Sequence, residues 1–488
     1  MMVVGGFVLV LSLVEISDGA TTSFPLISHR KQLHRRRLDT SSTNITVVDA
    51  RLFQGIGTHY VDLYIGTPDG QPQTLIVDTG SEWTAFPCLT GCCGQHTDDE
   101  FDHDKSQTFL TRSCKEGCGE QQYTTCPSDG RNCAVEMLYS EGSSWSAFEA
   151  TDQVSLLPDG SSSFPLRFGC QTRTTKLFRT QLADGIAGFD AGPLSFWRQA
   201  GVDSFSLCFS SSYDLEDLAG ILTLGGYDDR LIAGEELQWA KRGAVGNMKR
   251  AFYVFVQDVF FRSDDSTITP LEGFDASTVN RHGILLDSGT TITYFPESQK
   301  TAFISAFNKL TGHKWSYNLM LTLEQVQALP TLVVTLKGLN GEAGAQLEMP
   351  PLHYFDLSYS EDNMYEPAID FGDSKAVFGA NMLQGHNVYF SEDKIGVALS
   401  NCDYEAVVTL QQQQQQEEEQ PTPEKAQSIK IEVPEKKDFS SSTHGRRTFL
   451  TVMVVLGAVG GALFARNRPR SKQYAMVESS VDIEIELT

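Results

Sequence analysis

Two short motifs in the chain each place an aspartate before a hydroxyl residue and a glycine. Residues 78–80 read Asp-Thr-Gly, and residues 287–289 read Asp-Ser-Gly. Two carboxyl groups held about 3 Å apart cannot both ionise at mildly acidic pH, so they share one proton. One carboxylate can then take a proton from water while its protonated partner donates a hydrogen bond to a carbonyl oxygen. The pattern predicts that Asp78 and Asp287 together direct the attack of water on a carbonyl group.

The residues next to the two aspartates fit this chemistry. Gly80 and Gly289 let the backbone turn sharply and bring one carboxyl group close to the other. Four hydroxyl groups can donate hydrogen bonds to the carboxylates; they belong to Thr79, Ser81, Ser288 and Thr290. A single Asp-Thr-Gly is an ordinary turn sequence. Two of them, each at the end of an apolar run, form a much more specific signal.

The elements that must position these motifs are predicted to be strands. Residues 75–77 and 284–286 are apolar runs that end at the two aspartates, which makes them a faint internal repeat. Between residues 52 and 402, other short apolar runs alternate with Gly, Pro, Asp and Ser turns. Examples are the strands expected at 60–65 and 251–261. Residues 296–309 instead show the spacing of apolar residues that predicts a helix. We expect a duplicated all-β architecture with the site on a pseudo-twofold axis.

Composition limits the partners and the compartment. With 38 basic and 62 acidic residues the formal net charge is −24, so nucleic acid and anionic membrane surfaces would repel the chain. Seven of the ten cysteines lie between residues 88 and 133 without paired Cys-x-x-Cys spacing or a suitable histidine, which favours disulfides in an oxidising compartment over metal ligands. They are Cys88, Cys92, Cys93, Cys114, Cys118, Cys126 and Cys133. We expect neither a metal nor an organic cofactor.

The beginning of the chain indicates entry into the secretory pathway. Residues 1–19 contain an apolar run of signal-peptide length, the alternative being a buried strand. Residues 20–50 carry five cations and are interpreted either as a propeptide of a zymogen or as a solvated charged run. Asn44 begins the only Asn-x-Thr acceptor for N-glycosylation.

The end of the chain predicts a membrane anchor. Residues 403–448 form a Gln-, Glu- and Pro-rich linker with too little apolar surface to fold. Residues 449–465 are uncharged and would span about 25 Å as a helix, the alternative being a buried core helix. The denser basic flank follows them, so the body is expected in the lumen and residues 466–488 in the cytoplasm. Tyr474 to Val477 resembles a sorting signal for an adaptor protein.

Several motifs beyond the two aspartates resemble the pepsin-like aspartic proteases. Residues 65–68 are similar to the family's first strand end, and residues 183–188 and 376–379 to its two apolar segments beneath the aspartates. Residues 138–144 resemble the flap hairpin, with Tyr139 as the flap tyrosine that excludes water. The resemblance implies a bilobal fold, with lobes at 51–218 and 219–402 and a cysteine-rich insert at 88–133.

One position departs from the family pattern. The family usually has a tryptophan seven residues after the first aspartate, and here that residue is Ala85. We expect Trp83 or Phe86 to fill the space, which leaves open what hydrogen-bonds the flap tyrosine. The resemblance further implies a long-range disulfide between Cys208 and Cys402, leaving Cys170 and the insert cysteines to pair among themselves.

Within the family the chain resembles the nepenthesin-type branch, and most of all the membrane-anchored processing proteases related to plasmepsin V. Those enzymes cut newly made secreted proteins after the Leu of an Arg-x-Leu motif. The resemblance implies that Glu141 of the flap binds the substrate Arg, with help from Gln181. A solvated turn is the alternative for Glu141.

The sequence thus predicts a membrane-anchored lumenal endopeptidase of the Golgi, endoplasmic reticulum or endosome, acting on secreted or membrane proteins. One alternative is a broad-specificity acid protease of the cell surface or vacuole, which would not require Arg-x-Leu. Another is a non-catalytic peptide-binding homologue, which the two intact Asp motifs disfavour. A third interpretation, a scaffold, has only the low-complexity linker behind it.

Overall fold

The computed structural model describes most of the predicted body. Its described residues are 22–28, 58–88, 91–118, 123–128, 130–160, 163–210, 220–233, 236–245, 248–358, 360–372 and 375–402. The predicted signal peptide, Asn44, the linker, the membrane span at 449–465 and the tail with Tyr474 lie outside them. Among the helices of the described part, none combines the length and the apolar character needed to cross a bilayer.

The first lobe is built on a strongly curved run of strands in the order β2–β3–β10–β4–β9–β8–β7–β6, with β5 paired to β8. Its alternating buried side chains form the core beneath the first Asp motif, as in β2, where every other residue after Val61 faces inward. The bounds are β2 His59–Ile65, β3 Gln71–Asp78, β4 Ala85–Pro87, β5 Leu110–Thr111, β6 Thr124–Thr125, β7 Ala134–Leu138, β8 Ser144–Ser155, β9 Phe164–Thr174 and β10 Gly185–Gly188, with helices α1 Leu177–Thr180 and α2 Phe196–Gln199.

A shared sheet connects the two halves of the sequence. It runs β13–β28–β27–β11–β12–β1 and continues through β1 into β2 of the first lobe. Strand β1, within the segment predicted as a propeptide, pairs with β12 and β2, so at least these residues contribute to the sheet of the body. The bounds are β1 Thr22–Ser28, β11 Ser204–Phe209, β12 Gly220–Leu224, β13 Gln238–Lys241, β27 His386–Ser391 and β28 Lys394–Leu399.

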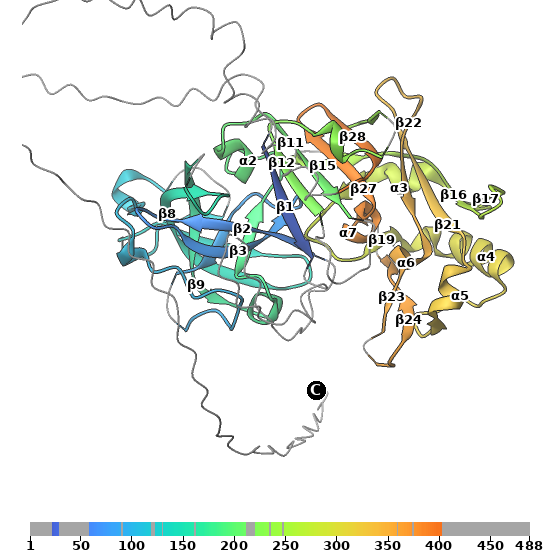
Figure 1. Cartoon of the computed structure of the whole chain (residues 1–488), viewed down its shortest axis with the longest axis horizontal. Coiled ribbons are helices and arrows are strands. Elements are labelled where there is room, and N and C mark those ends of the chain that lie inside the picture. The colour runs from blue at the N-terminus through green and yellow to red at the C-terminus, as the bar shows by residue number, and fades with distance from the viewer. Residues whose placement is uncertain are drawn as a thin grey trace, which may run out of the picture. The chain divides into compact units, whose positions relative to one another are not determined.

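The second lobe contains three sheets and most of the helical residues (Figure 1, yellow to orange). The first sheet holds β14 Gly243–Val245, β15 Met248–Val254, β18 Ile284–Leu286, β19 Thr293–Pro296, β25 Ile369–Gly372 and β26 Ala376–Phe378. The second holds β16 Val256–Arg262, β17 Ile268–Pro270, β21 Thr331–Lys337 and β22 Ala343–Met349, and the third β20 Leu321–Thr322, β23 Phe355–Leu357 and β24 Met364–Pro367. The helices are α3 Ala276–Val279, α4 Lys300–Thr311, α5 Leu323–Gln327, α6 Pro351–Tyr354 and α7 Ala380–Leu383.

Two expected elements differ in detail from the structure. The apolar run at 251–261, expected as one strand, belongs to β15 and β16, which lie in different sheets and are separated at Phe255. The Phe255 carbonyl accepts a hydrogen bond from Lys337 N at 2.7 Å, and its ring lies against Gly243. The helix expected at 296–309 is α4, which ends later, where Gly312 adopts φ 75° and its N–H bonds to the carbonyl of Asn308.

Aromatic side chains join the lobes below the site. Phe205 of β11, Phe252 of β15 and Phe390 of β27 are fully buried and contact one another, with ring centroids 4.9 to 5.9 Å apart. Such offset and edge-on pairs add to the free energy of burying the rings. The apolar core is therefore continuous from the first lobe through the shared sheet into the second.

Candidate active site

The two Asp motifs occupy equivalent positions in the two lobes. Each lies at the end of a strand that has a parallel neighbour: β10 beside β3, with Gly188 opposite Asp78, and β26 beside β18. Because the carboxyl ends of these strands face each other across the lobes, the motifs can exchange hydrogen bonds. The two apolar segments predicted beneath the aspartates occupy these neighbouring strands.

Hydroxyl groups lock the two loops together. Thr79 Oγ1 donates to the carbonyl of Leu286 at 2.9 Å, and Ser288 Oγ donates to the carbonyl of Val77 at 2.6 Å. In return, Thr79 Oγ1 accepts from Ser288 N at 3.0 Å, and Ser288 Oγ accepts from Thr79 N at 3.1 Å. Both hydroxyl residues are fully buried. The four bonds fix the position of one aspartate relative to the other.

Each carboxylate accepts the same two kinds of hydrogen bond. At Asp78, Oδ1 accepts from Gly80 N at 2.8 Å and Oδ2 accepts from the Ser81 hydroxyl. At Asp287, the corresponding donors are Gly289 N at 3.0 Å and Thr290 Oγ1 at 2.7 Å. The structure brings the residues of both motifs together, but only Ser81 and Thr290 donate to the carboxylates. The hydroxyls of Thr79 and Ser288, expected to do the same, donate instead to backbone carbonyls of the opposite loop.

The glycines of the motifs are required by the closeness of the carboxyl groups. A Cβ atom on Gly80 would lie 2.7 Å from the carboxyl carbon of Asp287, and one on Gly289 would collide with the carboxyl of Asp78. No larger residue fits at either position unless the dyad moves apart. The absence of a side chain, more than backbone freedom, is what the site needs here.

The electrostatics fit a proton shared by the two aspartates. Burial raises the pKa of Asp78 well above its ordinary value, and the charge of Asp287 and a hydrogen bond with it raise it further. The Ser81 hydroxyl and the Gly80 N–H act in the opposite direction, because they stabilise the carboxylate. The pair therefore retains one proton over the mildly acidic range, as a base and an acid acting together require.

The flap closes over this dyad from the first lobe. Tyr139 and Ser143 form the base of its tip through the bond from Tyr139 N to the Ser143 carbonyl, 2.9 Å, and Gly142 turns the chain with φ 88°. The ring of Tyr139 packs on Phe178 of α1 at 5.1 Å. Burial and the nearby charge of Asp78 raise the pKa of Tyr139, so its hydroxyl stays protonated.

The hydrogen-bond partner of the flap tyrosine is Trp145, a residue that the sequence analysis missed. Trp145 Nε1 donates to the Tyr139 hydroxyl at 3.2 Å. Trp83 and Phe86, expected to fill the space, are fully buried, but Trp83 stacks under the Arg167 guanidinium instead. Trp145 lies on β8, the second strand of the flap hairpin. An aromatic residue on that strand, close in sequence to Tyr139, was the sequence feature that could have indicated this hydrogen bond.

The two predicted substrate-binding residues lie in different environments. Glu141 is exposed at the flap tip, where its Oε1 accepts from Ser143 N at 3.3 Å. Gln181 is buried, and its amide nitrogen donates to the carbonyls of Ala183 and Gly185 at 3.0 and 3.4 Å. The amide nitrogen of Gln181 is thus engaged with the backbone, and of these two residues only Glu141 is exposed.

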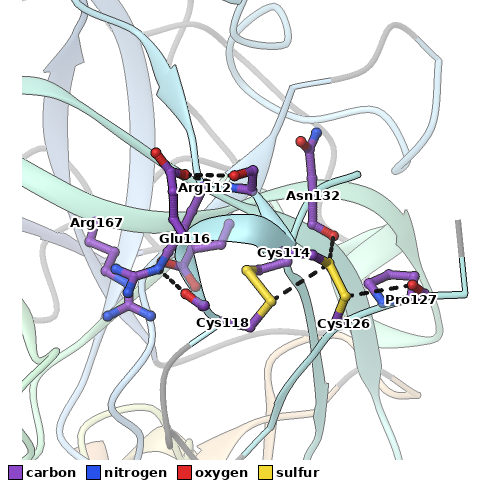
Figure 2. The surroundings of a disulfide bond; sticks show 12 residues. Arg112, Cys114, Glu116, Cys118, Cys126, Pro127, Asn132 and Arg167 are labelled. Atoms are coloured by element: carbon purple, nitrogen blue, oxygen red, sulfur yellow. Dashed lines mark hydrogen bonds and ion pairs between the residues drawn. A yellow bond between two sulfur atoms is a disulfide. The ribbon is translucent and has the colours of Figure 1, made fainter. Parts of the chain in front are cut away.

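All ten cysteines form disulfides, including the predicted pair Cys208–Cys402. The other bonds are Cys88–Cys170, Cys92–Cys93, Cys114–Cys126 and Cys118–Cys133. Figure 2 shows the last two, with the sulfurs of Cys114 and Cys118 only 3.8 Å apart. Three sulfurs of this group lie within metal-binding reach of one another, but a sulfur bonded in a disulfide offers no thiolate to a metal. The Cys114–Cys126 and Cys118–Cys133 disulfides cross-link the insert next to the flap strands.

Comparisons with known proteins agree with the geometry. A family model described as xylanase inhibitor N-terminal matches residues 59–226. Aspartic proteinase nepenthesin-1 of Nepenthes gracilis is 28% identical over 375 residues, 72% of this chain and 80% of the relative.

Two shorter matches cover part of the chain and part of each relative. Aspartic protease 5 of Toxoplasma gondii is 35% identical over 218 residues, 38% of this chain and 22% of the relative. Plasmepsin V of Plasmodium falciparum is 30% identical over 188 residues, 35% of this chain and 30% of the relative. With the paired Asp loops, the flap and the disulfide-braced insert in place, the chain is similar to the pepsin-like aspartic proteases, and among them to nepenthesin-type and plasmepsin V-like members.

Proposed function

We propose that this aspartic endopeptidase is anchored in the endomembrane system and cleaves secretory proteins after the Leu of Arg-x-Leu motifs. The observation that carries the proposal is the exposed carboxylate of Glu141 on the flap tip, above a complete aspartate dyad. A carboxylate is the partner that recognises a guanidinium group by two parallel hydrogen bonds. The likeness to plasmepsin V and to aspartic protease 5 adds to this support.

The chemistry follows from the dyad. The carboxyl groups of Asp78 and Asp287 share one proton, so one accepts a proton from the attacking water while the other hydrogen-bonds the peptide carbonyl. The proton then moves to the leaving nitrogen as the tetrahedral intermediate collapses. An extended substrate is held by main-chain hydrogen bonds as an added strand, and side-chain contacts supply specificity. Tyr139, held by Trp145, covers the reacting group and excludes bulk water.

The flap tip supplies the selectivity for a basic side chain. One carboxylate oxygen of Glu141, Oε1, accepts a hydrogen bond from Ser143 N, and the other is available to a ligand. Lys176 approaches the same tip through its Nζ, 3.4 Å from the Glu141 carbonyl rather than from the carboxylate. A substrate Arg therefore competes with the backbone N–H and not with a resident ion pair. Gln181 is buried below the flap, so in this proposal Glu141 makes the contact with the substrate Arg.

The anchoring and the compartment rest on the sequence. The apolar residues 449–465 with their basic flanks support a single-pass anchor with a lumenal body, and five disulfides fit an oxidising lumen. In this proposal residues 1–19 are a signal peptide, Asn44 is glycosylated, the basic segment holds a zymogen inactive, and the Tyr474 signal recruits a sorting adaptor. The Golgi, the endoplasmic reticulum and the endosome are the compartments it names.

The test uses the full-length chain, produced through an oxidising secretory pathway and purified in detergent. Two peptides that differ only in Arg or Ala at the first position of Arg-x-Leu are assayed from about pH 4 to 7. The enzymes are the native protein, Glu141→Gln, and Asp78→Ala as the catalytic control. We expect cleavage after Leu that needs the Arg, Glu141 and Asp78.

The other outcomes point to the competing functions. Equal cleavage of both peptides would leave a broad-specificity acid protease and reject the role of Glu141. Arg-dependent cleavage that survives Glu141→Gln would move the Arg contact to another residue. No cleavage by folded protein, after removal of the basic segment, would favour the peptide-binding homologue.

A further inference from the structure

A charged residue directly follows the first catalytic motif and is buried. Glu82 comes after Asp78, Thr79, Gly80 and Ser81, and its side chain is only 6% exposed. Burying a carboxylate is costly unless it is paired or hydrogen-bonded. Its Oε1 accepts a hydrogen bond from Leu194 N at 3.0 Å. Its Oε2 forms an ion pair with Arg250.

This ion pair joins the two catalytic loops by a second route. Arg250 lies on β15, whose residues Tyr253 and Val254 pair with β18, the strand that leads into Asp287. Glu82 continues the loop that carries Asp78. A contact between the two side chains therefore ties the loop of the first aspartate to the sheet of the second, outside the hydroxyl bonds already described.

Backbone bonds reinforce the same junction. Ala191 N donates to the carbonyl of Arg250 at 2.8 Å, and Asp190 N donates to the carbonyl of Ser81 at 2.9 Å. Ser81 is the residue whose hydroxyl bonds to the catalytic carboxylate of Asp78. A shift of the Glu82–Arg250 pair would therefore be passed to Asp78 through one residue.

A second buried carboxyl group faces the pair. Asp190 accepts from Gly192 N at 2.7 Å, and a Cβ on Gly192 would collide with Glu82 and lie 2.9 Å from Asp190 Oδ1. The cations near these two acids are Arg250 and Arg242. The Arg242 guanidinium donates hydrogen bonds to the backbone carbonyls of residues 249, 250 and 251. Burial and the charge of Glu82 raise the pKa of Asp190 to about 7, so at mildly acidic pH Glu82 does not share Arg250 with a second anion.

We propose that Glu82 and Arg250 are positioning residues that hold the Asp78 loop against the Asp287 strand during catalysis. They act through Ser81 and through β15 and not on the reacting atoms. The role does not depend on the Arg-x-Leu specificity, because it concerns the dyad and applies to any peptide that the native enzyme cleaves.

The test measures kcat and KM of the full-length Glu82→Gln variant on such a peptide, with the active enzyme counted by titration. Glutamine still accepts from Leu194 N but offers Arg250 no charge. We expect kcat to fall roughly tenfold, because small displacements of catalytic groups cost this much or more, with KM changed less than about twofold. The affinity for a peptide that carries a hydroxyl in place of the scissile carbonyl should fall in parallel with kcat.

Two further variants make the result decisive. Arg250→Lys keeps the charge and should keep a larger share of kcat than Glu82→Gln. Arg262→Gln breaks the ion pair of Arg262 with Glu348, whose cation is exposed to a similar degree but lies between β16 and β22, away from both Asp loops. It should leave kcat unchanged.

The proposal is overturned if Glu82→Gln keeps native kcat, if the loss matches the fraction of inactive protein, or if Arg262→Gln loses as much. Should Glu82→Gln not fold, Arg250→Gln decides alone: its amide offers Glu82 no charge, so a native kcat in that folded variant would reject the positioning role. Native enzyme that cleaves no Arg-x-Leu peptide but cleaves others would reject the substrate proposal and leave this one standing.

Discussion

Two sets of side chains with displaced pKa values, one in each lobe, differ in kind. In the first lobe these are carboxyl groups: Asp98 has its pKa raised to about 8 by burial and by Asp184, and burial raises that of Asp184 as well. In the second lobe they are imidazoles: burial lowers the pKa of His386 to about 4 and that of His353 to about 3. Burial thus favours the neutral form of these four groups: Asp98 and Asp184 are neutral when they hold a proton, and His353 and His386 are neutral when they do not.

Linkage gives the direction of each effect. A carboxyl group with a raised pKa binds its proton more tightly in the folded state, so its contribution to stability is complete below about pH 4 and is lost as pH rises through 8 for Asp98. A histidine with a lowered pKa contributes fully above about pH 6.5 and loses that contribution as pH falls through 4 for His386. Between about pH 4 and 8 the folded protein keeps Asp98 protonated and His386 deprotonated, which is the neutral form of each group.

The largest expected effect concerns the catalytic dyad, to which each lobe contributes one aspartate. Asp78→Asn and Asp287→Asn should each lower kcat by at least about 10³-fold, because either change removes one half of the acid–base pair. Peptide cleavage by folded protein measures this. Substantial activity left in either variant would mean that the two loops are not functionally equivalent.

The second lobe should be the one that fails in acid. His386 Nε2 accepts from Glu348 N at 3.0 Å while Nδ1 faces the carbonyl of Gln384, so protonation of the ring removes an acceptor from a buried N–H. We expect His386→Gln to lose roughly 2–3 kcal/mol less stability than the native protein between pH 6.5 and 4, since a shift of one pKa unit is worth about 1.4 kcal/mol.

Thermal unfolding at both pH values measures the difference. His313→Gln, at a half-buried site in the same lobe, is the control and should follow the native pH dependence. An unchanged acid loss in His386→Gln would contradict the assignment of the acid-sensitive group.

The first lobe should be the one that weakens towards neutral pH. Asp98 N donates to Asp184 Oδ1 at 2.9 Å, and Asp184 Oδ2 accepts from Thr74 Oγ1 at 2.6 Å, which places two carboxyl groups in one network. Asp98→Asn keeps the shape without a proton to lose, so its unfolding temperature should fall less between pH 5 and 8 than that of the native protein. Asp69→Asn, at a solvent-exposed position, should behave as native.

The smallest expected effect concerns the flap, which only the first lobe carries. Trp145→Phe removes the donor to the Tyr139 hydroxyl but keeps an aromatic ring, so kcat/KM should fall several-fold, corresponding to about 1 kcal/mol for one hydrogen bond. Tyr139→Phe should cost a similar amount, and the double variant no more than either alone. Additive losses would show that the two residues act independently.

Local patterns were sufficient to predict the strands that end at Asp78 and Asp287, because apolar runs and Asp-Thr-Gly turns are properties of short segments. The family resemblance supplied Tyr139 and the Cys208–Cys402 bridge. Trp145 and Glu82 escaped prediction because their roles depend on hairpin register and on contacts between lobes, which no single segment encodes. The same limit explains why the Gln181 amide faces the backbone and why the run at 251–261 divides between two sheets.

The Cys208–Cys402 bridge joins residues 194 positions apart in the sequence, and the whole second lobe lies between them. A protease that cuts one exposed loop inside this segment leaves two fragments that are still covalently joined, and β11 remains paired with β27 next to the bond. Nicked protein would therefore migrate as one species until it is reduced. The bridge therefore holds the two parts of a singly cut chain together.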